Sequence, residues 1–125
     1  MARVDYFERK LDDKNRLTIP SELREEFDSG VVITRGFGKY LHLYPKDVWD
    51  RDMETALSGD ILDEAIADKN VKFRVGKVET KLDGKQGRVK LDNYQLDYAG
   101  ISRDVIAVRV GNYWRVMNPE AVSAL

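Results

Sequence analysis

The chain has 125 residues and no cysteine, and its 21 basic and 22 acidic side chains give a net charge of −1. This length fits one domain with a hydrophobic core, and the lack of cysteine excludes a disulfide framework and thiolate chemistry. No apolar run is long enough to span a bilayer, and the N-terminal stretch lacks a signal-peptide core, so we expect a cytoplasmic protein.

The first half of the chain alternates short strand patterns with turns and one short helix. Asn15 suits a left-handed backbone conformation in its turn, and Pro20 suits the start of a helix. In chain order we predict a strand at residues 4–8, a polar turn at 12–15, a strand at 16–19, a helix at 21–27, and strands at 31–34 and 40–44.

The middle of the chain is helical and acidic, and the second half repeats the first. A helix is predicted from Pro45, and after an interruption at residues 58–59 a second amphipathic segment ends near Asn70. Asp92 suits the N-cap of a later helix. The second half is predicted to contain a strand at residues 78–82, a turn at 83–88, a helix at 92–98, strands at 105–108 and 113–117, and a short final helix.

An internal repeat organises these elements. Asp12 precedes Arg16 in the first polar turn as Asp83 precedes Arg88 in the second, and the two arginines are 72 positions apart. Such self-similarity indicates one supersecondary unit that occurs twice. We predict a first repeat with its helical segment at residues 1–70 and a second at 71–125. They should form one compact domain, because a single repeat would be marginal alone.

Charge is distributed unevenly along the chain. Residues 72–90 hold seven cations and two anions, a balance of +5, whereas residues 45–68 hold two cations and eight anions, a balance of −6. A molecule with separate basic and acidic regions can bind a polyanion while it stays nearly neutral. The alternative, that both regions are ordinary solvated faces, remains open from charge alone.

The residue types in the two turns suit contacts with DNA. Arginine can bond guanine at two positions, asparagine and glutamine can bond adenine, and lysine contacts phosphate. A single polar turn would be interpreted as an ordinary hairpin, but two related copies favour the functional interpretation. Asp12, Asp83 and Gly87 are expected to organise the turns, the aspartates by holding the arginines or capping turn N–H groups. The candidate DNA-binding residues are Lys14, Asn15, Arg16, Lys85, Gln86 and Arg88.

Signals for catalysis or cofactor binding are weak. His42 is the only histidine and lies in a predicted strand, so we interpret it as structural. One histidine without cysteine makes a zinc site unfavourable, and no glycine-rich phosphate loop or acid/base pair stands out. We therefore expect no metal, no cofactor, no small-molecule ligand and no enzymatic activity.

Residues 12–20, with Thr34-Arg35-Gly36 and Leu43-Tyr44-Pro45, resemble the first half of the MraZ family. Residues 85–89 and 98–101 are similar to its second half. The resemblance implies a mainly β, α+β fold of the AbrB-like swapped-hairpin type, in which tandem ββαββ repeats form one barrel with pseudo-twofold symmetry.

The resemblance also implies a function. MraZ proteins are bacterial transcriptional regulators of the division and cell-wall gene cluster. They are ring-shaped homo-oligomers that bind double-stranded DNA at promoter direct repeats through their arginine turns. They usually repress their own operon, which implies a protein associated with the nucleoid.

Two points stay open from the sequence. The second turn is one residue longer than the first, so Asp83 either holds Arg88 as Asp12 is expected to hold Arg16, or it does not. Two other functions also fit: an AbrB-type antitoxin whose acidic segment at residues 47–68 binds a toxin, and a protein-interaction ring that does not bind DNA.

Overall fold

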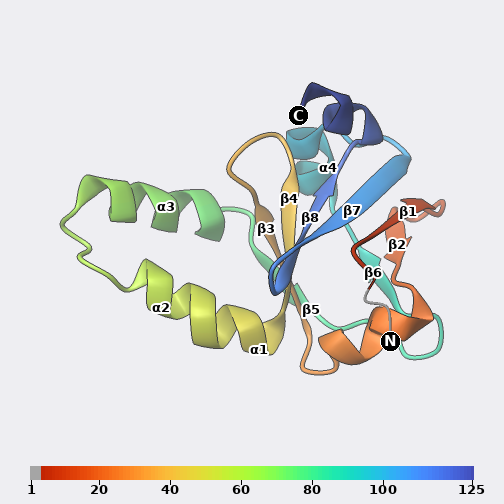
Figure 1. The fold of residues 1–125 in the computed structure, drawn as a ribbon, viewed down its shortest axis with the longest axis horizontal. Coiled ribbons are helices and arrows are strands. Elements are labelled where there is room, and N and C mark those ends of the chain that lie inside the picture. Colours follow the sequence, from red (N-terminus) through yellow and green to blue (C-terminus); the bar gives the residue numbers. More distant parts are fainter. Residues whose placement is uncertain (1–3) are drawn as a thin grey trace.

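The computed structural model describes residues 4–125; residues 1–3, part of the stretch expected to lack a signal peptide, lie outside the described residues. The predicted α+β, mainly β class is confirmed. A sheet lies at the centre of the molecule, with a helical arm on one side and a small ribbon with short helices on the other (Figure 1).

Among residues 4–125, six strands form the central sheet in the order β1-β7-β8-β4-β3-β5, and two further strands form the ribbon β2-β6. All the pairings are antiparallel. The strands are β1 (Tyr6–Lys10), β2 (Arg16–Thr18), β3 (Val31–Arg35), β4 (Leu41–Pro45), β5 (Val78–Thr80), β6 (Arg88–Lys90), β7 (Asp104–Val110) and β8 (Tyr113–Met117).

The two repeats exchange strands with each other. β1 of the first repeat pairs with β7 of the second, and β5 of the second pairs with β3 of the first. Where β4 meets β8, His42 lies opposite Arg115, and where β2 meets β6, Leu17 lies opposite Val89. Each of these pairs joins equivalent positions of the two repeats. The pseudo-twofold axis therefore passes through both pairs.

The helices differ from prediction mainly in the arm. The predicted helix end near Asn70 is wrong: α3 continues to Arg74, so the repeat boundary predicted after residue 70 falls inside it. The Asn70 side chain donates to the carbonyl oxygens of Leu57 and Ile66 and so joins α3 to α2 instead of ending the helix. The helices are η1 (Ser21–Phe27), α1 (Lys46–Val48), η2 (Trp49–Met53), α2 (Glu54–Leu57), α3 (Glu64–Arg74), α4 (Asn93–Ala99) and η3 (Pro119–Ala124).

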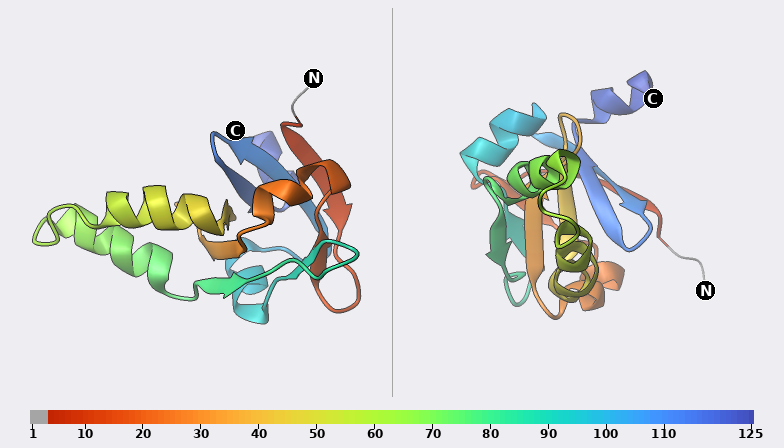
Figure 2. Two further views of the ribbon diagram at one scale, coloured as in Figure 1. Left: turned by 90° about the horizontal axis from the view of Figure 1, so that it is seen from below. Right: turned by 90° about the vertical axis from the view of Figure 1, so that its left-hand side faces the viewer.

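Two apolar clusters hold these layers together. The larger fills the space between the sheet, the ribbon, η1 and α4, and includes Phe7, Leu17, Val89 and Trp114. The smaller joins the sheet to the base of the arm around Trp49. Beyond that base the arm projects away from the sheet (Figure 2). In the described part of the chain, no helix is both long and apolar enough to cross a membrane.

Candidate nucleic-acid interface

The two predicted arginine turns meet on one small ribbon. β2 and β6 have three residues each, and the central ones, Leu17 and Val89, are buried against the core. Because side chains alternate along a strand, the flanking residues face outward. Arg16 lies opposite Lys90, and Thr18 lies opposite Arg88. The sequence places one arginine in each of two polar turns that are far apart in the chain, and the structure brings both to a single outward face.

Asp12 organises the first turn. Its Oδ1 accepts hydrogen bonds from the backbone N–H groups of Lys14 and Arg16, both at 2.9 Å, and its Oδ2 accepts one from Arg16 Nε at 2.7 Å. Burial by itself would raise the pKa of the Asp12 carboxyl, but these hydrogen bonds outweigh it and lower the pKa to about 2. Asp12 is therefore ionised at neutral pH and fixes the direction of Arg16.

Asp83 holds Arg88 in the same way, which resolves the open alternative. Its Oδ1 accepts from the Arg88 N–H at 2.9 Å, and its Oδ2 accepts from Arg88 Nε at 2.7 Å. The backbone hydrogen bond from Arg88 is the main cause of a lowered pKa at Asp83. Arg88 Nη1 also lies 3.7 Å from Oδ2 of Asp12. The two arginines and two aspartates thus form one connected cluster.

Backbone hydrogen bonds join the two turns. Asn15 and Gly87 have φ angles of 59° and 62°, so both occupy the left-handed region, as predicted for Asn15. The Ile19 N–H donates to the Gly87 carbonyl oxygen at 2.8 Å, and the Leu91 N–H donates to that of Asn15 at 3.0 Å. Each turn is thereby tied to the strand exit of the other repeat.

The remaining predicted residues surround this cluster. Lys14, Lys85 and Gln86 are exposed, Asn15 is half-buried, and Gly87 is buried. Among the described residues, no ion pair involves the side chain of Lys14 or Lys85. These ammonium groups are free to contact an anionic ligand.

Sequence reasoning did not single out Lys90 and Asn93, which lie beside the first turn. The signal for Lys90 was the alternation of Arg88, Val89 and Lys90 in a short strand, which places both cations on one face. The position of Asn93 depends on how the second repeat folds against the first turn. No local pattern carries that information.

The basic segment at residues 72–90 does not form one continuous patch. Arg74 donates hydrogen bonds to both carboxylate oxygens of Glu54 at 2.9 Å, so its positive charge is neutralised within the arm. Lys77 pairs with Glu79 at 3.1 Å. Only the later part of the segment adds free positive charge near the ribbon.

His42 is structural in its contacts. It is 1% exposed, its Nδ1 lies 2.7 Å from the Tyr44 hydroxyl, and its ring makes stacked contacts with the rings of Tyr40 and Phe73. Burial, with a smaller contribution from Arg115, lowers the pKa of His42 to about 4, so the ring is neutral at pH 7. Within residues 4–125, no group of histidine and carboxylate side chains is arranged to hold a metal ion.

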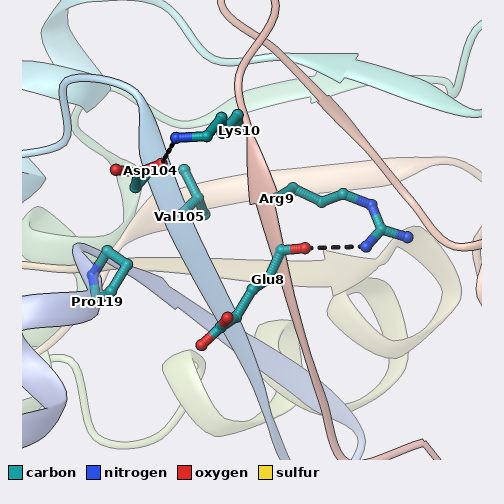
Figure 3. A pocket seen from close by; sticks show the side chains of 6 residues that line it. All are labelled: Glu8, Arg9, Lys10, Asp104, Val105 and Pro119. Atoms are coloured by element: carbon teal, nitrogen blue, oxygen red, sulfur yellow. Dashed lines mark hydrogen bonds and ion pairs between the residues drawn. The ribbon is translucent and has the colours of Figure 1, made fainter.

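A cleft of about 380 Å³ lies beside the edge strand β1 (Figure 3). None of its lining residues belongs to the cluster on the ribbon. Its lining includes the ion pair between Lys10 and Asp104, at 2.8 Å, and the carboxylate of Glu8. The two cations of the lining, Arg9 and Lys10, are matched by two carboxylates, so this cleft offers a phosphate backbone no excess of positive charge. The ribbon is therefore the better candidate interface.

Comparisons with known proteins agree with the resemblance described above. A family model described as "MraZ protein, putative antitoxin-like" matches residues 5–67. A protein of Thermomicrobium roseum, named "Transcriptional regulator MraZ", is 38% identical over 91% of this chain and 80% of its own length. Proteins of the same name from Syntrophomonas wolfei and Clostridium beijerinckii are each 36% identical, over 91% and 86% of this chain and 79% and 75% of their own lengths.

Proposed function

Because the chain belongs to the MraZ family, we propose that it is a DNA-binding transcriptional regulator that contacts DNA through the outward face of β2 and β6. Membership in a family of transcriptional regulators confirms the expectation that the protein is not an enzyme. The observation that carries the proposal is the convergence of Arg16 and Arg88 on the outward face of one ribbon, where each is half-buried and fixed by an aspartate.

The geometry supports a division of roles. Held arginines lose little conformational freedom on binding, and a guanidinium can bond both major-groove acceptors of guanine. In our proposal Arg16 and Arg88 contact bases. Lys14 and Lys85, which are unpaired in residues 4–125, contact phosphates. Asn15 and Gln86 assist at neighbouring bases, and Gly87 provides the left-handed turn that positions Arg88.

The finer biological assignment is also a proposal. We infer a repressor of the division and cell-wall gene cluster, including its own operon, that acts at the nucleoid in the cytoplasm. Residues 1–70 and 71–125 would act as two repeats of one unit within a ring-shaped homo-oligomer. One ribbon makes few contacts, so useful affinity requires several subunits on direct repeats in the promoter DNA.

Fluorescence anisotropy with a labelled duplex from upstream of the protein's own gene tests this proposal, with a scrambled duplex and varied salt. We expect Arg16→Ala and Arg88→Ala each to weaken specific binding about tenfold or more, because a bidentate arginine–guanine contact contributes about 1–3 kcal/mol. Arg51→Ala is the matched control, because Arg51 also donates Nε to an aspartate but lies on the arm. Equal affinity of the wild type for both duplexes would overturn the proposal.

A second candidate function is an antitoxin. The family description includes the words "antitoxin-like", and the acidic arm projects from the sheet on the side away from the ribbon. A toxin-binding arm predicts that a small partner protein co-purifies with the native chain and is lost when the arm's acidic residues are neutralised. Purification without such a partner, together with specific DNA binding, favours the regulator.

A further inference from the structure

The pseudo-twofold axis relates the two turns, but the surfaces beside them are not equivalent. Beside the first turn lies a cleft of about 360 Å³ between Lys14 and Asn15 on one side and the start of α4 on the other. It is lined by Lys14, Asn15, Lys90, Asp92 and Asn93. This cleft directly adjoins Arg16, because Lys90 is the strand partner of Arg16.

The charges in this cleft favour an anion. Lys90 is exposed and, among the described residues, takes part in no ion pair. The single carboxylate, that of Asp92, accepts a hydrogen bond from the Gln95 N–H at 2.8 Å and caps α4. Two unpaired ammonium groups therefore face one carboxylate that is already engaged within the fold.

The surface beside the second turn lacks this charge. A cleft of about 200 Å³ there is lined by two cations, Arg24 and Lys81, and two anions, Asp28 and Asp83. Arg24 is already engaged, because its Nε donates to the Ile19 carbonyl oxygen at 2.9 Å. The position equivalent to Lys90 is occupied by Thr18, as the pairing of Leu17 with its counterpart Val89 shows.

The two arginines also differ in how many of their guanidinium nitrogens are bonded within the fold. Arg16 is bonded to its aspartate through Nε alone, so within the described structure its terminal nitrogens carry no hydrogen bond. Arg88 is bonded through Nε and also lies within 2.7 Å of Asp83 through Nη2. Among the described residues, Arg16, beside the basic cleft, therefore has both terminal nitrogens free of hydrogen bonds, whereas Arg88 has one, Nη1.

We propose that Lys90, with Lys14, holds a DNA phosphate beside Arg16, so that each pseudo-symmetric ribbon binds the duplex in one orientation. This inference rests on the proposed DNA-binding function and adds a contact residue and a polarity to it. The side of the ribbon that carries Lys14 and Lys90 makes the stronger contact with the DNA backbone. The side that carries Thr18 makes the weaker one. Subunits that bind in the same orientation fit repeats that also point in one direction.

Salt-dependent anisotropy of Lys90→Thr, which installs the residue of the equivalent position, tests the phosphate contact. Each phosphate contact contributes about 0.9 to the slope of log K against log salt, so the slope should fall by about 1 for each bound subunit. Affinity should fall similarly for specific and scrambled duplexes. Lys90→Arg should keep the wild-type slope. Lys69→Thr, which removes an exposed lysine of α3, is the matched control.

A second measurement tests the polarity. The chain has no cysteine, so an iron chelate can be attached to a Gly84→Cys variant, where an added Cβ meets no atom within 4 Å. In the Gly84→Cys variant we expect the DNA to be cleaved on one side of each half-site. When Lys90→Thr and Thr18→Lys are added, we expect cleavage on both sides or on the opposite side. The inference is overturned if one-sided cleavage survives this exchange, or if Lys90→Thr leaves the salt slope unchanged. In either case, specific binding by the wild type would still support the proposed function. Absence of salt-dependent DNA binding by the wild type overturns both.

Discussion

Gly87 and Asn15 occupy equivalent left-handed positions, but only Gly87 is tightly enclosed. A Cβ on Gly87 would clash with the Arg24 side chain, and the φ angle of 62° disfavours residues other than glycine, asparagine and aspartate. We expect Gly87→Ala to lower the free energy of unfolding by about 1–2 kcal/mol, because a left-handed backbone costs about this much for an L-residue. Urea denaturation measures the change.

Gly84→Ala is the matched control for this substitution, in the same turn. A Cβ on Gly84 meets nothing within 4 Å, and its backbone is not in the left-handed region. The control should change stability by less than about 0.5 kcal/mol, as surface substitutions usually do. Equal losses in both variants would contradict the strain argument for Gly87.

At the residue scale, local chemistry was predictable from the sequence and spatial neighbours were not. The left-handed Asn15 and the capping Asp92 follow from intrinsic preferences of single residues, and the structure confirms both. The hold of Asp83 on Arg88 across a longer turn was left open, because one extra residue can either bulge outward or displace the carboxylate. In the structure, the Asp83 carboxylate accepts hydrogen bonds from Arg88 despite the extra residue.

The junction of β4 and β8 carries a buried histidine, from which we expect a sensitivity to acid. Five aromatic rings, those of Phe37, Tyr40, Tyr44, Phe73 and Tyr113, contact His42, and Arg115 is the charged group that faces it. Protonation would therefore place a second cation beside Arg115 in a nearly closed apolar site. The neutral ring is the form that the fold stabilises.

The resulting pH dependence has a defined sign. The pKa of His42 is lowered from 6.5 to about 4 by folding, so its contribution is complete above pH 6.5 and is lost as the pH falls toward 4. Between pH 7 and pH 5 we expect a loss of about 2 kcal/mol, from 1.36 kcal/mol for each pKa unit. Urea denaturation of the wild type and His42→Phe at both pH values measures it. A wild-type slope that persists in His42→Phe would assign the effect to other groups.

At the element scale, strand patterns were more informative than helix ends. The buried runs of β3 and β4 were predicted within one or two residues, because continuous apolar runs between turn residues have few alternatives. The start and end of α3 were missed. The helix was expected soon after the interruption at residues 58–59, but Asp63 sets its start by accepting the Ala65 N–H, and Ile61 and Leu62 remain exposed before it.

Over the whole molecule, the ribbon carries free positive charge, whereas the arm carries negative charge and exposed apolar side chains. The acidic arm projects on the side of the sheet away from the ribbon (Figure 1). Its negative charge is therefore distant from the proposed DNA-binding face. The arm also exposes apolar side chains, among them Ile61 at 67% and Leu62 at 92%. Exposed apolar groups of this kind mark contact surfaces, and the proposed ring needs such a surface.

We expect the double substitution Ile61→Asp and Leu62→Asp to reduce the assembly to smaller species without unfolding the subunit. Light scattering after size-exclusion chromatography gives the mass, and circular dichroism checks the fold. Val122→Asp, on an exposed residue of η3, is the control and should leave the mass unchanged. An unchanged mass in the double variant would place the subunit contacts elsewhere.

The exchange of strands between the repeats also has a consequence for how the protein is made. Phe7 in β1 finds its sheet partner in Ala107 of β7, 100 positions later in the chain. During synthesis, β1 therefore has no sheet partner until nearly all the strands have left the ribosome. Pairings between such distant segments slow folding and expose strand edges in the meantime. The nascent chain should therefore fold late and in one step, and should depend on protection from aggregation while it grows.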